Sequence, residues 1–255
     1  MSFIEIKDLV KKYGNTTAIN NITLDIDGGQ IYGILGPNGS GKTTLLKIIS
    51  GILPPTSGSV TVNGINAVTG ADSIKKFLGY IPETPALYES LTPIEFFNFI
   101  GSVFNIDSAT LKERINAFSS ALEIEKYMNE FIGSLSFGTK QKVAIISALI
   151  HDPQLLVMDE GMNGLDPRSS RIIKELLRDF ASKGRTVIFS THIMEIAENV
   201  CDTISILYNG NIAGTGSLEK LKEEAGSNNT DLEEIFLRLT GDNDLDTLLN
   251  SLKDL

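Results

Sequence analysis

Apolar and polar side chains alternate with a period of two along much of the first third of the chain. Such alternation predicts β-strands, because successive side chains of a strand point to opposite faces of the sheet. Unbroken apolar runs predict strands buried on both faces. The strands expected on these grounds cover residues 3–9, 19–26, 30–35, 59–62, 79–83, 155–158, 186–190, 203–208 and 212–215. The turn-rich segment 11–15, which contains Tyr13, joins the first two.

Other segments repeat their apolar side chains every three or four residues, which predicts helices. Three of them begin at N-capping signals, at Thr92 with a capping box, at Ser136, and at Thr230 with a second capping-box pattern. Glycines that suit a helix C-terminus end the first helix and the last. The expected helices lie over residues 42–50, in two segments of a mainly helical block over about 83–135, and over 136–150, 167–183 and 230–241.

Strands and helices therefore alternate over most of the chain, which predicts an α/β fold with a mostly parallel sheet. The N-terminal strands predict an antiparallel β subdomain, and the helical block predicts a subdomain inserted over about residues 84–138. We expect one domain over residues 1–216 and a C-terminal helical extension over 217–255, whose last part is acidic and rich in leucine.

The composition argues against several functional classes. A formal net charge of −10 disfavours a nucleic-acid binder, since such proteins need a basic face toward the phosphates. The single cysteine, Cys201, rules out an internal disulfide and fits a reducing cytosol. The N-terminus lacks the pattern of a signal peptide, and the apolar segments are shorter than the roughly 20 residues that span a membrane. We expect a soluble chain.

The stretch Gly36-Pro37-Asn38-Gly39-Ser40-Gly41-Lys42-Thr43-Thr44 matches the pattern G-x-x-x-x-G-K-[ST] between an expected strand and an expected helix. Glycines, which have no Cβ atom, allow backbone amides to converge on phosphate oxygens at a helix N-terminus. Lys42 can reach the terminal phosphates, and Thr43 can ligate Mg²⁺. An ordinary glycine-rich turn would not explain Lys-Thr after the last glycine. The stretch predicts a site for a nucleoside triphosphate.

Two adjacent carboxylates, Asp159 and Glu160, follow the apolar run 155–158. The carboxyl ends of parallel strands form the edge of a sheet where ligands bind. Adjacent side chains point in different directions, so one carboxylate can serve a metal and the other a water molecule. The alternative is a solvated strand end. His192 follows the strand 186–190 and is a candidate for the same site, whereas His151, in a loop before a proline, is interpreted as structural.

The combination of this loop, a helical insertion, Leu135-Ser136-x-Gly138-x-x-Gln141, Asp159-Glu160 and His192 resembles the nucleotide-binding subunit of an ABC transporter. The resemblance covers about residues 3–216 and implies a P-loop NTPase with a RecA-like core that binds ATP and Mg²⁺. The implied roles are adenine stacking by Tyr13, phosphate binding by residues 36–44, catalysis by Lys42, Glu160 and His192, Mg²⁺ binding by Thr43, Glu83 and Asp159, contact with the ATP of a second copy by Ser136, Gly138 and Gln141, and a dimer contact by Asp166.

The chain departs from the family pattern at two places. Phe137 stands at the third position of the signature L-S-G-G-Q and Thr139 at the fifth, which puts the dimer contact in doubt. Glu83 replaces a glutamine that senses Mg²⁺ and the attacking water. The Pro82-Glu83 pair and the segment 87–92 resemble cassettes of the drug, antibiotic, sodium and multidrug export branch, so export is favoured over import.

The resemblance implies an ATPase that is peripheral on the inner face of the cell membrane and drives a separate membrane-spanning permease subunit. A second ATP-binding subunit is also implied, with a homodimer favoured over a heterodimer. The alternative is a soluble ABC ATPase that powers assembly of a partner complex, such as iron–sulfur cluster biogenesis. The aromatic cluster around residues 87–104 is interpreted as core, with a partner-binding groove as the alternative. No segment identifies the cargo.

Overall fold

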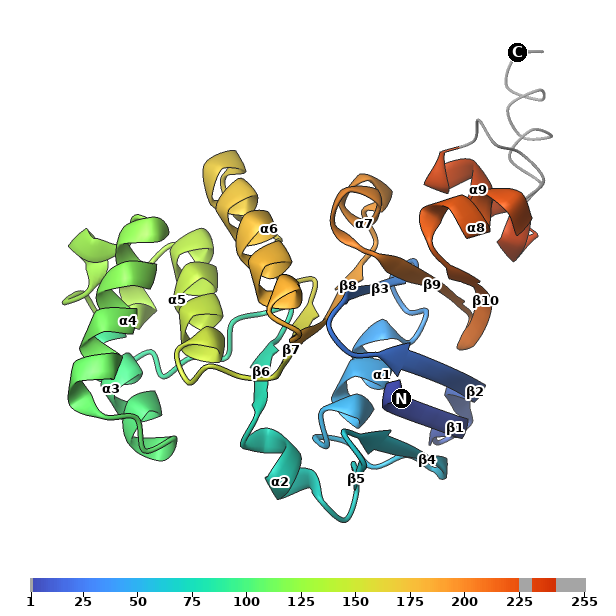
Figure 1. The fold of residues 1–255 in the computed structure, drawn as a ribbon, viewed down its shortest axis with the longest axis horizontal. Helices are drawn as coiled ribbons and strands as arrows, with labels where there is room; N and C mark the ends of the chain where they lie inside the picture. Colours follow the sequence, from blue (N-terminus) through green and yellow to red (C-terminus); the bar gives the residue numbers. More distant parts are fainter. Residues whose placement is uncertain (1, 225–230, 242–255) are drawn as a thin grey trace.

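The computed structural model describes residues 2–224 and 231–241. A six-stranded sheet crosses the middle of the molecule, with a helical block at one end and a second, antiparallel sheet toward the other (Figure 1). The central sheet has the order β10-β9-β3-β8-β7-β6, and all its neighbouring strands are parallel except β9 and β10. Its strands are β3 (Ile31–Leu35), β6 (Leu78–Ile81), β7 (Leu155–Asp159), β8 (Thr186–Thr191), β9 (Thr203–Tyr208) and β10 (Asn211–Gly216). The expected α/β fold with a mostly parallel sheet is confirmed.

The second sheet has four antiparallel strands in the order β2-β1-β4-β5. These are β1 (Ser2–Tyr13), β2 (Thr16–Asp27), β4 (Ser57–Val62) and β5 (Ile65–Asn66). The first two strands are longer than the sequence predicts, and Tyr13 is the last residue of β1 rather than part of a loop. The irregular register of β1 and the left-handed backbone of Asp8, at φ 48°, interrupt the period-two pattern but do not end the strand pairing. The strand predicted from alternation is therefore shorter than the observed one.

The helix that follows the phosphate-binding stretch, α1 (Lys42–Ile49), is buried between the two sheets. Its four large apolar residues, Leu45, Leu46, Ile48 and Ile49, pack against one face of the central sheet and against the antiparallel sheet. Complete burial of such a side chain contributes about 1.5–3 kcal/mol. The start of α1 is therefore held at a fixed place beside the ends of β3, β7 and β8.

The opposite face of the central sheet is covered by α5 (Phe137–Leu149) and α6 (Pro167–Ser182), which share a core with the helical insertion. The insertion contains α3 (Pro93–Val103), α4 (Ser108–Ala121) and the short 3₁₀ turns η1 (Glu125–Tyr127) and η2 (Ile132–Ser134). Thr92 forms the expected capping box with Glu95, and the Ser136 side chain accepts a hydrogen bond from the Thr139 amide as the N-cap of α5. The expected inserted helices and both caps are confirmed.

Three short helices have no counterpart among the sequence-based expectations: α2 (Ala71–Lys75), α7 (Met194–Val200) and α8 (Leu218–Glu224). Segments of five to seven residues hold too few turns to display a helical period. The helix α9 (Leu232–Thr240) is capped by Asp231, whose side chain accepts from the Glu234 amide; the expected start at Thr230 lies outside the described residues, as do residues 242–255. Together α7, α8 and α9 bury apolar side chains against β9.

Candidate functional site

The phosphate-binding stretch forms a tight loop between β3 and α1. Gly36 tolerates no side chain, because a Cβ atom there would lie 2.2 Å from the carbonyl oxygen of Leu207. Gly39 and Gly41 adopt left-handed backbone conformations, with φ values of 82° and 111°, that glycine reaches without strain. The Gly36 amide donates to the carbonyl of Thr191 at 3.2 Å, which fixes the loop to the end of β8. The close approach of backbone at Gly36 and the left-handed conformations of Gly39 and Gly41 thus explain why glycine occupies these three positions.

Lys42 begins α1, and its ammonium group points back into the loop. Nζ donates to the carbonyl oxygens of Gly36 at 2.7 Å and Pro37 at 3.2 Å, and lies 3.4 Å from Oε1 of Glu160. The side chains of Lys42 and Glu160 are only 6% and 4% exposed. A buried charge pair of this kind is held in place by its additional hydrogen bonds. The structure therefore brings together two of the residues to which the sequence assigns catalysis.

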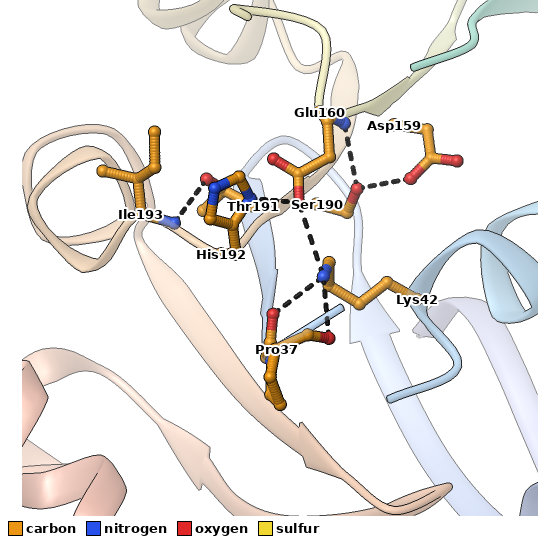
Figure 2. A network of polar contacts seen from close by, with 9 residues as sticks. Pro37, Lys42, Asp159, Glu160, Ser190, Thr191, His192 and Ile193 are labelled. Carbon is orange, nitrogen blue, oxygen red and sulfur yellow. Dashed lines mark hydrogen bonds and ion pairs between the residues drawn. The ribbon is translucent and has the colours of Figure 1, made fainter. Parts of the chain in front are cut away.

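His192, the third of these residues, reaches the same carboxylate oxygen. Its Nδ1 lies 2.9 Å from Oε1 of Glu160, so that Lys42 and His192 converge on one atom (Figure 2). The other carboxylate oxygen, Oε2, is buried and accepts no hydrogen bond from the described residues. Glu160 itself has a left-handed backbone, with φ 51°, which is unusual for a residue with a side chain. This turn directs its side chain away from the strand direction of Asp159.

Ser190, to which sequence reasoning assigned no role, links the Asp159 carboxylate to the Glu160 backbone. It is fully buried opposite Asp159, in the last pair of the β7–β8 ladder. Its hydroxyl donates to Oδ1 of Asp159 at 2.7 Å and accepts from the Glu160 amide at 3.1 Å (Figure 2). A serine at the end of a β-branched strand carries no distinguishing pattern. Only the pairing of β8 with β7 reveals its position.

A pocket of about 390 Å³ opens beside this cluster. All of the residues that line it except Ala18 belong to the sequence-predicted set, and they are Ala18, Asn38, Gly39, Gly41, Lys42, Thr43, Thr44, Glu83 and Glu160. Glu83 is an exposed residue just beyond β6, on the rim of the same pocket. Gly36, Pro37 and Ser40 form the underlying loop instead of the lining. Most of the predicted phosphate-binding residues thus face a single cavity.

The residues around the pocket suit a magnesium ion. Mg²⁺ binds through one or two protein oxygens together with phosphate oxygens and water, so it does not need a cage of protein ligands. No group of three His, Cys, Asp or Glu side chains with metal-binding geometry occurs among the described residues. Thr43 lines the pocket, and Asp159 is buried with one oxygen held by Ser190. Burial first, and the Asp159 charge second, raise the pKa of the nearby Tyr80 hydroxyl above its ordinary value.

The signature segment lies at the start of α5, away from the pocket. Ser136 is exposed and Gly138 is partly exposed, so both can meet a second molecule. The Phe137 ring is 47% exposed and lies against Gly164, where an added Cβ would be 2.5 Å from the ring. Gln141 is different. It is completely buried, and Nε2 donates to the Gly161 carbonyl at 2.9 Å, so the expected contact of Gln141 with a second copy is not supported by its position.

Asp166 is the N-cap of α6. Its carboxylate accepts from the Ser169 amide at 2.8 Å and from the Ser169 hydroxyl at 2.6 Å, and it lies 2.9 Å from Nζ of Lys142. The hydrogen bonds from Ser169, followed by the one from Lys142, hold the pKa of Asp166 far below its ordinary value. These contacts are all within the chain. Half of the side chain remains exposed for the dimer contact that the sequence suggests.

The candidate Tyr13 and the histidine interpreted as structural, His151, both lie outside the cluster. Tyr13 is 49% exposed at the tip of β1, with the Lys11 ammonium 5.2 Å from its ring centroid. It does not line the pocket. His151 stacks on Phe104 with ring centroids 3.8 Å apart, and its Nε2 lies 3.0 Å from the Leu78 carbonyl oxygen. Burial lowers the pKa of His151, in keeping with its interpretation as a structural residue.

Comparisons with known proteins agree with this geometry. Residues 19–163 match the family model described as ABC transporter. The ABC-type transporter ATP-binding protein EcsA of Bacillus subtilis is 33% identical over 240 residues, which are 94% of this chain and 97% of that protein. The Nod factor export ATP-binding protein I of Cupriavidus pinatubonensis is 33% identical over 254 residues, 100% of this chain and 76% of that protein.

Solved structures show the same similarity. A structure of an ATP-binding subunit of an ABC transporter superposes with a TM-score of 0.89 at 32% identity, over 94% of this chain and all of that one. A dimeric ATP-binding cassette in a post-hydrolysis state with ADP and Pi gives 0.77 at 27% identity, over 84% of this chain and 98% of that one. Within the described residues, no helix is long and apolar enough to cross a bilayer.

Proposed function

The chain belongs to the ABC transporter family of ATP-binding subunits, and from this premise we propose that it hydrolyses MgATP at a site completed by a second copy of itself and thereby drives export through a separate membrane subunit. The observation that carries the proposal is the convergence of Lys42 and His192 on Oε1 of Glu160, beside a pocket lined by the phosphate loop. Phosphoryl transfer needs a positioned nucleophile and neutralised charge, and this arrangement supplies both.

The geometry suggests how these side chains divide the work. The loop amides and Lys42 bind the phosphates, whose negative charge replaces the loop carbonyls as partner of the ammonium group. Oε2 of Glu160 is the free acceptor that orients a water molecule toward the γ-phosphorus. His192 uses Nδ1 to hold Oε1, which leaves Nε2 for the γ-phosphate. As water attacks, the bond from phosphorus to the ADP oxygen breaks and the proton of the water moves toward Glu160.

Mg²⁺ would be held by the Thr43 hydroxyl and, through water, by Asp159. When bound, it supplies further neutralisation of phosphate charge during transfer. Ser190 leaves one oxygen of Asp159 to face such a water molecule. Glu83 on the pocket rim adds a second carboxylate in place of the family's usual glutamine. Two carboxylates and a hydroxyl form the oxygen-rich set that this cation prefers.

A second copy of the chain would complete the site. The exposed Ser136, with the N-terminal amides of α5 behind it, presents hydrogen-bond donors that suit the γ-phosphate bound to the other subunit. The similar cassette that was solved with ADP and Pi is a dimer. Because the same chain carries both the phosphate loop and the exposed signature, a symmetric homodimer would contain two complete sites.

The helical insertion is our candidate for the surface that meets the membrane subunit. Its aromatic cluster is not fully buried. Phe96 and Phe97 belong to the core, whereas Tyr88 and Phe99 are 58% and 44% exposed and pack edge to face with ring centroids 5.7 Å apart. Large exposed aromatic side chains are typical of interaction sites. Through such a partner the chain would be peripheral on the inner face of the cell membrane.

Export is favoured over import by Pro82-Glu83 and by the relative named for Nod factor export. The names of the relatives reported above refer to transport, so these relatives do not favour the alternative of an ATPase that powers complex assembly. To test the proposal, the tagged chain is purified from membranes of its native cells. We expect a polytopic membrane protein to co-purify and to raise ATPase activity, and we expect a Tyr88→Asp, Phe99→Asp variant to lose that partner. Recovery only in complexes without a membrane protein would contradict it.

A further inference from the structure

We propose that Ser190 is a positioning residue for ATP hydrolysis, because its single hydroxyl fixes both the Asp159 carboxylate and the backbone turn that presents Glu160. The inference rests on the proposed function and adds to it a residue outside the sequence motifs. Ser190 is fully buried, so it acts through its two neighbours and does not touch the nucleotide itself.

The direction of each hydrogen bond follows from the chemistry of the groups. The Glu160 amide can only donate, so the Ser190 oxygen accepts that hydrogen bond. The one hydroxyl proton is then available for Oδ1 of Asp159, at 2.7 Å. A hydroxyl that donates to a charged acceptor forms a stronger hydrogen bond than a neutral pair. The contact therefore holds Asp159 in one rotamer and leaves its other oxygen for a metal-bound water.

The second contact supports an unusual backbone conformation. Glu160 has φ 51°, and left-handed residues with a side chain persist only where surrounding contacts hold them. Its amide is bound twice, by the Ser190 hydroxyl at 3.1 Å and the Ser190 carbonyl at 3.2 Å. This turn separates the directions of two adjacent carboxylates. Loss of the hydroxyl would remove one support of the Asp159 carboxylate and one support of the Glu160 backbone at once.

The residues after Ser190 strengthen this interpretation. The Thr191 carbonyl accepts from the Gly36 amide, and His192 contacts the Glu160 carboxylate. Three consecutive residues at the end of β8 therefore contact Asp159 and the Glu160 amide, the phosphate loop, and the Glu160 carboxylate in turn. Figure 2 shows the contacts of the first and the last of them. In the sheet, β8 lies between β3 and β7. Its end can therefore align the phosphate loop, which follows β3, with the carboxylates at the end of β7.

The test compares Ser190→Ala with a matched variant, Ser205→Ala. Ser205 is also a fully buried serine of the central sheet, but it hydrogen-bonds Tyr32 and Thr215 away from the pocket. Binding of Mn²⁺, in place of Mg²⁺, to the complex with a non-hydrolysable ATP analogue is measured by electron paramagnetic resonance. Analogue binding without metal, kcat and the unfolding midpoint are measured in parallel.

In Ser190→Ala we expect Mn²⁺ affinity and kcat each to fall by about tenfold or more, the effect of losing one hydrogen bond to a charged group. Metal-free analogue binding should stay within about twofold, because Ser190 does not touch the phosphate loop. Ser205→Ala should leave the Mn²⁺ affinity, kcat and the metal-free binding of the analogue unchanged. Ser190→Thr, which keeps the hydroxyl, should restore part of the Mn²⁺ affinity.

Equal Mn²⁺ affinity and kcat in Ser190→Ala and Ser205→Ala would overturn the inference. If Ser190→Ala does not fold, Ser190→Cys keeps the size and replaces the hydroxyl by a weak donor, and wild-type Mn²⁺ affinity in that variant would overturn it equally. Failure of the unaltered chain to bind the nucleotide would instead contradict the proposed function. The two failures are therefore distinguishable.

Discussion

Replacement of Glu160 by glutamine separates nucleotide binding from hydrolysis. The carboxylate lies 3.4 Å from the Lys42 ammonium, with both side chains almost fully buried. At this distance the gross Coulomb attraction is about 5 kcal/mol for an effective dielectric constant of about 20, and desolvation of the two groups cancels much of it. Glutamine has the same shape and keeps an oxygen that Lys42 and His192 can contact. The variant should therefore fold, with a small loss of thermal stability.

The effect on catalysis should be much larger. An amide cannot accept the proton of the attacking water, and loss of a general base costs about 10²–10⁴ in rate. That range corresponds to about 3–5 kcal/mol of transition-state stabilisation. ATP affinity should stay the same or increase, because one negative charge is removed from beside the phosphates.

Steady-state ATPase assays and binding of a fluorescent ATP analogue measure the two effects separately. Glu195→Gln, an exposed glutamate on α7, is the matched control and should retain both activities. Wild-type turnover in the folded Glu160→Gln protein would refute the role that the geometry gives to Glu160. A parallel loss of nucleotide binding would show that the carboxylate mainly stabilises the loop.

Three further predictions concern stability and are measured by chemical unfolding. Gly36→Ala should cost about 3 kcal/mol, since its Cβ would lie 2.2 Å from the Leu207 carbonyl oxygen, whereas Gly28→Ala meets only ordinary contacts; equal losses would contradict this. Asp166→Ala should lose about 1 kcal/mol of helix capping and Asp166→Asn only a few tenths, and the reverse order would rule out a capping role. The pKa of His151 is lowered in the folded chain. At a pH below the ordinary value of 6.5, the unfolded chain therefore binds a proton that the folded chain does not, and the free energy of unfolding decreases as the pH decreases. His151→Gln should flatten that fall between pH 7 and 5.5; an unchanged slope would argue against it.

The central features of the site were predictable from the sequence because they are encoded by residue type and spacing. The phosphate loop has glycines where the structure allows no side chain, and Asp159-Glu160 stands at the end of a fully apolar strand. His192 was predicted from its place after a strand, and its Nδ1 indeed reaches Glu160. These residues owe their positions to local chain geometry that leaves a clear sequence pattern.

The remaining features depend on contacts between distant segments. Ser190 meets Asp159 only because β8 pairs with β7, and a serine in a strand carries no sign of this. Gln141 was grouped with Ser136 by motif, but it follows Ser136 by five residues, which turn a helical side chain by about 140°. Gln141 is therefore buried while Ser136 is exposed. Tyr13 was placed in a loop because irregular pairing in β1 masks the alternation. Tertiary context decided each of these positions.

The proposal that hydrolysis requires two copies is tested most directly by the dependence of specific activity on protein concentration. ATPase rate per chain is measured over a dilution series, with the fraction of dimer determined in the same solutions by sedimentation. We predict that the rate per chain rises with the dimer fraction and that Ser136→Arg, on the exposed signature, abolishes this rise while each chain still binds ATP. A rate per chain that stays constant down to concentrations at which the protein is monomeric would contradict the account.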